Sequence, residues 1–302
     1  MDIVNVLLDP ILPVFLIIAV GYGFGRAGKT TFDEARVINK VAMNVFLPIM
    51  IFGLIANAPI YEFNALAVLS YLIVEVIVFF IGYLIARRIC NRSKDESVLL
   101  AFCGIFANNA FYVLPISLLL YGEAGVLPIT TVITLDATIT FGGAMIALQV
   151  FRLGRVSPVE VASSLLRTPV LQAIVLGLVA SLLQVEIPSS VNTFLTFNGA
   201  ATAPIALFAL GVVMSQTAFK LDSTVTIFTG IKLIVFPALV ALTLSIFGLL
   251  PGKGDLFLLA SAGPAGTMAF SLALFHNVKT DAIVMIMVCT SVLTLLTLAA
   301  LA

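Results

Sequence analysis

Three ionisable side chains interrupt long apolar segments of this 302-residue chain: Glu75, Asp136 and Lys232. Charged groups inside apolar helices are expensive to bury, and they usually face a cavity or one another. Glu75 and Lys232 are 157 positions apart, and Asp136 lies within the threonine-rich stretch ITLDATIT. A permanent salt bridge between Glu75 and Lys232 and a proton-coupling site both fit these two residues. We expect ion coupling, if the protein uses it, at Glu75, Asp136 and Lys232.

A second set of polar and small residues breaks two apolar runs at their centres. The run Ala101–Tyr121 reads AFCGIFANNAFYVLPISLLLY, and Leu256–His276 reads LFLLASAGPAGTMAFSLALFH. Proline removes a helical hydrogen bond, and the helix that starts after a break has unpaired N–H groups and partial positive charge suited to an anion. We expect the first helix to unwind just after its two asparagines. The predicted anion-binding residues are Asn108, Asn109, Pro115, Gly263, Pro264, Gly266 and Thr267.

The composition defines the setting of these residues. The chain is 61% hydrophobic and 10% charged, with a mean hydropathy of +1.20. Soluble domains carry about 25% charged residues, so the chain is predicted to be an all-α polytopic membrane protein. Its formal net charge of zero gives no sign of a nucleic-acid partner. No Ser/His/Asp set, metal cluster or phosphate loop stands out, which argues against an enzyme.

Ten apolar segments are long enough to cross a bilayer, since roughly 20 residues span the hydrocarbon core. Lysines and arginines gather in alternate connections, and the connections at 58–63, 122–126 and 186–188 have none. By the positive-inside rule, both termini lie outside the cytoplasm. The predicted spans are Asp9–Arg26, Ala35–Asn57, Asn64–Ile89, Ser97–Tyr121, Leu127–Phe151, Val161–Val185, Ser189–Gln216, Thr224–Leu250, Asp255–His276 and Thr280–Ala302.

The two halves of the chain resemble each other. The segment Asn39–Ile55 is similar to Asn198–Val213, and the broken fourth and ninth spans occupy matching positions. Because each half has five helices, an odd number, the second copy must be inverted in the membrane. We predict repeats over residues 1–155 and 156–302, the architecture that alternating-access transporters use. Glycines near the end of the first span, GYGFGRAG, follow an apolar helix and are interpreted as helix-packing residues.

The segment INKVAMNVFLPIMIFGLIAN and the breaks NNAFYVLP and AGPAGTMAF resemble the auxin efflux carrier family. The resemblance covers the whole chain. It implies that helices 1, 2, 6 and 7 form a scaffold, that helices 3–5 and 8–10 form a transport domain, and that the fourth and ninth helices cross. It places Asn109, Pro115 and Pro264 at that crossing, and it adds Asn44 of the second span to the candidate substrate residues.

The combined prediction is an inner-membrane secondary transporter of a small organic anion, a mono- or dicarboxylate, that works by an elevator mechanism. No cofactor is expected beyond a coupling ion, H⁺ or Na⁺. The expected partners are the anion and the lipid bilayer, and the sequence allows a homodimer. A sodium/bile-acid-like symporter or cation antiporter is one alternative, disfavoured because neither intramembrane acid lies in a break. A non-transporting membrane sensor is the other.

Overall fold

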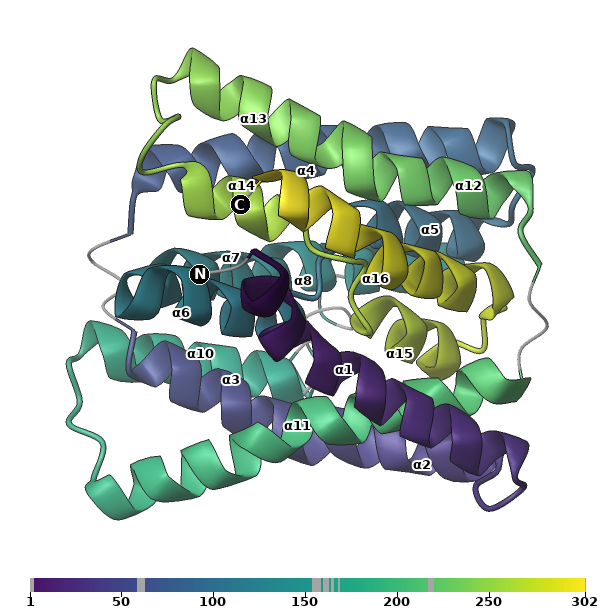
Figure 1. Ribbon diagram of the computed structural model, residues 1–302, viewed down its shortest axis with the longest axis horizontal. Coiled ribbons are helices and arrows are strands. Elements are labelled where there is room, and N and C mark those ends of the chain that lie inside the picture. The colour runs from purple at the N-terminus through teal and green to yellow at the C-terminus, as the bar shows by residue number, and fades with distance from the viewer. Residues whose placement is uncertain are drawn as a thin grey trace. The chain divides into compact units, whose positions relative to one another are not determined.

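The computed structural model describes residues 3–58, 63–153, 159, 163, 166–167, 169–216 and 220–301. Within these residues the chain is helical, and its sole β-type pairing is an isolated antiparallel bridge between Ala107 and Ala265. The predicted boundary between the two repeats, at residues 155 and 156, lies outside the described residues. Figure 1 shows how the helices follow one another along the chain. The fold class predicted from composition is therefore confirmed as all-helical.

The chain divides into two compact units. Unit 1 comprises Met1–Ile11, Phe63–Arg152 and Ala218–Ala302, and unit 2 comprises Leu12–Glu62 and Leu153–Thr217. Each unit therefore combines segments from both halves of the sequence. The helix α1, Ile3–Arg26, begins in unit 1 and continues into unit 2.

Unit 2 contains most of α1 together with α2, the π-helical turn η1, α3, α10 and α11. Helix α3 packs against α10 and α11 (Figure 1). A side chain at Gly21 of α1 would collide with the backbone of Phe208, and one at Gly211 of α11 would collide with that of Ile18. The helix-packing interpretation of the glycines in GYGFGRAG is confirmed for Gly21 and Gly25, whereas a side chain at Gly23 or Gly28 would meet nothing within 4 Å. The bounds of these elements are α2 Phe32–Val41, η1 Ala42–Phe46, α3 Leu47–Ala56, α10 Pro169–Leu182 and α11 Ser189–Gln216.

Unit 1 contains the remaining elements. Helix α4 packs along α5 and α13, and α5 also contacts α12, α15 and α16. The bounds in the first half are α4 Ala65–Arg88, α5 Lys94–Ile105, η3 Asn109–Val113, α6 Leu114–Tyr121, η4 Gly122–Gly125, α7 Val126–Leu135, η5 Asp136–Thr140 and α8 Phe141–Leu153. In the second half they are α12 Ser223–Gly230, η6 Ile231–Val235, α13 Phe236–Ile246, α14 Asp255–Ser261, α15 Met268–Phe275 and α16 Asp281–Leu301.

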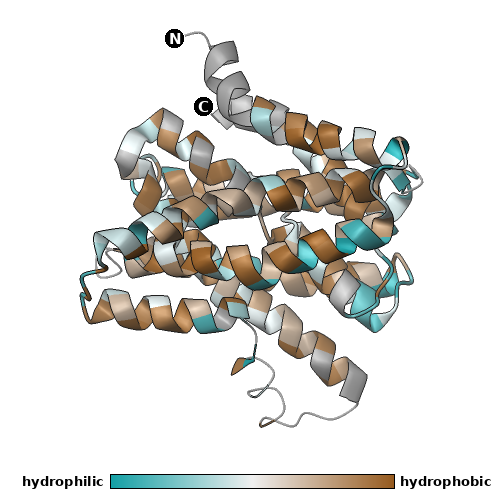
Figure 2. Cartoon of the chain, turned by 90° about the horizontal axis from the view of Figure 1, so that it is seen from below, coloured by the Kyte–Doolittle hydropathy of each residue, from teal (hydrophilic) through white to brown (hydrophobic). Residues whose placement is uncertain are grey.

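Five helices are long and apolar enough to cross a membrane: Phe32–Ala56, Ala65–Arg88, Val126–Leu148, Ser189–Gln216 and Ser223–Ile246. Shorter apolar helices cover Phe15–Arg26, Gln172–Leu182 and Asp281–Thr294. Figure 2 shows hydrophobic residues along the helices and hydrophilic residues at many of their ends. The predicted fourth and ninth spans are each split into two shorter helices, which is why neither is among the long ones.

Local sequence explains where several helices begin. Thr31 caps α2 by accepting a hydrogen bond from the Glu34 amide, and the Glu34 carboxylate accepts one from the Thr31 amide in return. Asn64, Ser93 and Asp222 accept in the same way at the starts of α4, α5 and α12. Side-chain oxygens at these positions satisfy amides that have no partner within the helix.

Candidate functional site

The two broken helices of unit 1 cross at their breaks. Helix α5 ends at Ile105 and η3 begins at Asn109, and α14 ends at Ser261 while α15 begins at Met268. In between, the Asn108 amide donates to the Pro264 carbonyl over 2.8 Å, and the Gly266 amide donates to the Phe106 carbonyl over 2.9 Å. These reciprocal bonds surround the bridge between Ala107 and Ala265. Each break therefore satisfies backbone groups that the other exposes.

The first break lies earlier than the sequence suggested. The non-helical residues are Phe106–Asn108, so Asn109 follows the break instead of preceding it. Pro115 is the second residue of α6, beyond η3, and its side chain lies outside the described part of the chain. Pro115 lies a π-helical turn beyond the break, inside the helical segment that continues from η3, so it does not set the break. In the ninth span Pro264 itself lies in the unwound segment, as expected.

Glycines allow the two unwound segments to approach each other. A Cβ atom at Gly266 would lie 2.5 Å from Phe106 Cδ1 and 3.2 Å from the Ala107 carbonyl oxygen. A Cβ atom at Gly263 would lie 2.5 Å from Val113 Cγ2. Real Cβ atoms do not come so close to their neighbours, so the small residues here have a packing reason.

Two helices start at the crossing and two end there. The segments Asn109–Tyr121 and Met268–Phe275 begin directly after the unwound residues, so their N-termini, with partial positive charge, adjoin the crossing. The backbone groups that the second break exposes also have hydrogen-bond partners. The Ala265 amide donates to Thr290 Oγ1 over 3.1 Å, and Lys232 Nζ donates to the Ser261 carbonyl over 2.8 Å. Ala265 would have bonded Ser261 in an unbroken helix, so Lys232 and Thr290 replace that lost bond.

A group of buried polar side chains from α4, η3 and η5 lies beside the crossing. Asn109 Nδ2 donates to Asp136 Oδ2 over 3.0 Å, and Thr140 Oγ1 donates to Glu75 Oε2 over 3.0 Å. The carboxyl groups of Glu75 and Asp136 interact directly with each other, and the Tyr71 hydroxyl is next to Asn109. Glu75, Asp136 and Asn109 are at most 2% exposed. We name Tyr71, Glu75, Asn109, Asp136 and Thr140 the carboxyl cluster.

Lys232 interacts electrostatically with the carboxyl cluster but forms no direct ion pair with it. Its Nζ lies 4.7 Å from the centre of the Phe236 ring, and it interacts electrostatically with Asp136 and Glu75. The ion pairs among the described residues are Arg92 with Glu96 and Arg92 with Asp222, so a direct Glu75–Lys232 salt bridge is not one of them. The lysine side chain instead reaches the Ser261 carbonyl at the end of α14.

π-Helical turns hold most of the predicted polar site residues. Asn109 and Asp136 are the first residues of η3 and η5, Lys232 is the second residue of η6, and Asn44 lies in η1 of unit 2. Such turns are rare and often occur at functional sites. Asn44 is exposed, whereas Lys232 is completely buried.

The predicted substrate residues are not all brought together by the structure. Asn108, Asn109, Gly263, Pro264, Gly266 and Thr267 all lie in or next to the crossing. Asn44 belongs to the other unit, and Pro115 lies a π-helical turn away from the break. Tyr71, Ser261 and Thr290 also belong to this site and were not predicted from the sequence. Tyr71 was detectable, because it precedes Glu75 by one helical turn and shares its face.

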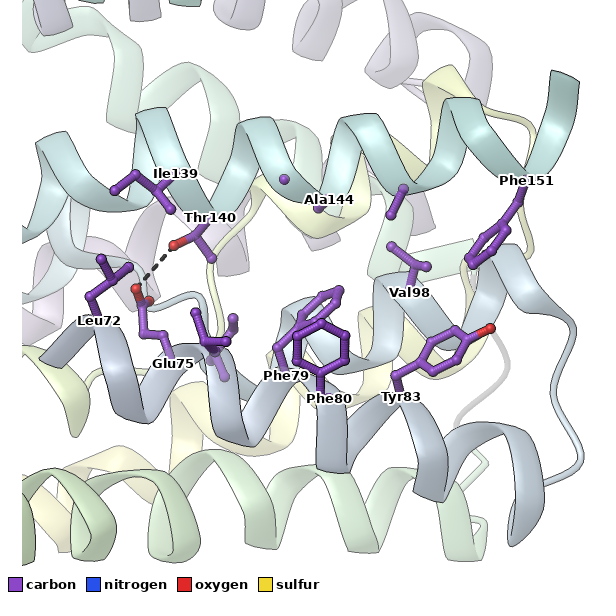
Figure 3. A pocket seen from close by; sticks show the side chains of 14 residues that line it. Leu72, Glu75, Phe79, Phe80, Tyr83, Val98, Ile139, Thr140, Ala144 and Phe151 are labelled. Carbon is purple, nitrogen blue, oxygen red and sulfur yellow. Dashed lines mark hydrogen bonds between the residues drawn. The ribbon is translucent and has the colours of Figure 1, made fainter. Parts of the chain in front are cut away.

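A cavity of about 350 Å³ lies beside the carboxyl cluster, between α4, α5, η5 and α8. Figure 3 shows Glu75 and Thr140 at one end of it and Tyr83 and Phe151 at the other. Most of its lining is aromatic or aliphatic. Glu75 therefore has mostly apolar neighbours on the side that faces the cavity.

Comparison with known proteins identifies the family. The family model described as "Membrane transport protein" matches residues 6–149 and 155–302. The "Putative malonate transporter" of Rhizobium meliloti is 24% identical over 79% of this chain and 76% of its own length. The "Uncharacterized transporter YfdV" of Escherichia coli K12 is 26% identical over 89% of this chain and 88% of its own. An uncharacterized transporter of Methanocaldococcus jannaschii is 24% identical over 97% of this chain and 96% of its own. The resemblance to the auxin efflux carriers is thereby confirmed, and the chain belongs to this family of multi-pass membrane transport proteins.

Proposed function

We propose that this protein is a secondary transporter of a small organic anion, and that the anion binds at the crossing of the two broken helices. The observation that carries the proposal is the pair of helix N-termini that begin at one crossing, at Asn109 and Met268. Unpaired N–H groups and the positive ends of two helix dipoles suit a carboxylate. The amides of Asn108 and Asn109 and the hydroxyl of Thr267 supply further donors for it.

The proposed membrane architecture has ten spans in two inverted five-helix repeats, located in the inner membrane with both termini outside the cytoplasm. Three features support it: the alternation of lysine and arginine, the matched breaks, and a unit composition that draws on both halves. We assign unit 1, which contains the crossing, as the moving transport domain and unit 2 as the scaffold. Asn44 of unit 2 remains in the proposed substrate set.

Coupling to a cation is an integral part of the proposal. Neither acid lies in a break of the sequence, which disfavours a cation-coupled symporter or antiporter. In the folded chain, however, Asp136 accepts a hydrogen bond from Asn109, the first residue after the break, so one acid does adjoin the crossing. Glu75, Asp136 and Lys232 are therefore the proposed coupling residues for H⁺ or Na⁺.

Uptake into proteoliposomes tests this function. Radiolabelled mono- and dicarboxylates, including malonate because of one relative's name, are offered to the purified protein with imposed proton or sodium gradients and with neither. We expect saturable uptake of one carboxylate class that unlabelled substrate inhibits. Substitution of Asn109 by alanine should reduce that uptake, and substitution of the exposed Glu186 by glutamine, as a control, should not. Equal uptake by protein-free liposomes would contradict the proposal.

A further inference from the structure

Four buried oxygen atoms of the carboxyl cluster have no hydrogen-bond partner among the described residues. They are Tyr71 Oη, Glu75 Oε1, Asn109 Oδ1 and Asp136 Oδ1. Buried polar atoms are nearly always hydrogen-bonded, so such a concentration in one place requires an explanation. The other oxygens of the two carboxyl groups already accept hydrogen bonds, from Thr140 and from Asn109 Nδ2.

The carboxyl cluster has fewer hydrogen-bond donors than its unpartnered oxygens need. The Tyr71 hydroxyl carries a hydrogen and is next to Asn109, so it can donate to Asn109 Oδ1. The remaining two oxygens belong to Glu75 and Asp136, whose carboxyl groups are within hydrogen-bonding reach of each other. Two ionised carboxylates are acceptors only and cannot bond to each other. One added proton would supply the donor that these two carboxyl oxygens lack.

The net charge of the buried side chains also indicates one added proton. Two carboxylates and the ammonium group of Lys232 together carry one net negative charge, and all three side chains are at most 2% exposed. An uncompensated charge in such a place is costly. One proton makes the group electrically neutral.

We infer that Glu75 and Asp136 form a binding site for one proton, shared between Glu75 Oε1 and Asp136 Oδ1. This inference rests on the proposed function and names its coupling ion as H⁺. Asp136 Oδ2 holds Asn109 at the crossing, so loss of the proton changes the charge of the group that positions a substrate-binding amide. A single shared proton supplies the hydrogen-bond donor that the two carboxyl oxygens lack.

The surroundings of Glu75 isolate this site. The titratable groups that interact with it are Asp136 from η5, Lys232 from η6 and Tyr71 from α4 itself. Helices α7 and α13 have no titratable side chain. Helix α5 carries charged residues in its first turn, at the end away from the break, and the thiol Cys103 nearer to it. Because the cavity beside Glu75 is lined mostly by apolar groups, the polar connection of the site runs through Asp136 and Asn109 towards the crossing.

Infrared spectroscopy of the purified protein at pH 7 detects the proton directly. Exposed carboxyl groups are ionised at this pH, so a carbonyl band of a protonated carboxyl that shifts in D₂O reports a buried one. We expect the wild type to show this band, Glu75→Gln and Asp136→Asn to lose it, and Glu186→Gln at the exposed control site to keep it. A wild type without the band, or a band unchanged in both cluster variants, would overturn the inference.

Transport measurements supply the second test. A glutamine at position 75 can accept from Thr140 and donate to Asp136, so it imitates the protonated state and should fold. With one proton per anion, a pH difference of one unit drives about tenfold accumulation in the wild type. In Glu75→Gln the accumulation ratio should fall to about one, while exchange of labelled for unlabelled substrate continues. Accumulation driven by sodium and not by pH would refute proton coupling. A wild type that transports no carboxylate would refute the proposed function, and the infrared result would still decide on the proton site.

Discussion

The contact between the two unwound segments predicts that Gly266 cannot carry a side chain without cost. In Gly266→Ala the new methyl group would lie 2.5 Å from Phe106 Cδ1 and 2.7 Å from Phe106 Cε1. Extra methylene groups in a packed interior cost about 1–3 kcal/mol. The reduced freedom of the unfolded chain returns roughly 0.4–1 kcal/mol, so a net loss of about 1–2 kcal/mol remains. Substrate transport should fall as well, because a shift of Phe106 disturbs Asn108 two residues later in the same unwound segment.

Thermal unfolding of the purified protein, with Gly142→Ala as the control, measures this effect. A Cβ atom at Gly142 of α8 would meet nothing within 4 Å, so that variant should unfold at the wild-type temperature or slightly higher. The double variant with Phe106→Leu removes the ring edge and should recover part of the loss. A coupling free energy of about 0.5–3 kcal/mol between the two positions is expected for residues in contact. If Gly266→Ala unfolds no earlier than Gly142→Ala, the crossing is not packed as described.

Further variants test the substrate site, the membrane topology and the charge balance of the carboxyl cluster. In Asn109→Ala the loss of a buried donor should weaken carboxylate binding by about 1–3 kcal/mol, measured by titration calorimetry, and unchanged affinity would remove Asn109 from the site. In a background without native cysteines, a cysteine at Ala124 should react with an impermeant thiol reagent added to intact cells, and one at Ser93 should not; the reverse pattern would invert the topology. Lys232→Met leaves the buried carboxyl groups without a counter-charge and should cost about 3–5 kcal/mol of stability in thermal unfolding; a melting temperature equal to that of the wild type would refute the charge balance.

Local sequence features are enough to predict the helical class, the ends of many helices and the two breaks. Apolar length and capping residues are local properties, so the span predicted over Ser189–Gln216 coincides with α11. Proline and glycine are equally local signals, so the break around Pro264 was predictable. The family was also accessible from sequence motifs.

Which residues contact one another depends on how the helices pack in three dimensions. The break at Phe106–Asn108 contains no proline; it exists where the Pro264 carbonyl and the Gly266 amide of a distant segment replace helical hydrogen bonds. The partner of Glu75 could not be read from the repeat offset, because spacing along the chain does not specify the rotation of one helix against another. Glu75 interacts with Asp136 and Thr140, and Lys232 bonds a carbonyl that the second break leaves free. Backbone groups and charges without partners are costly in an apolar interior. Their partners here come from other helices of unit 1, so the contacts depend on how those helices pack.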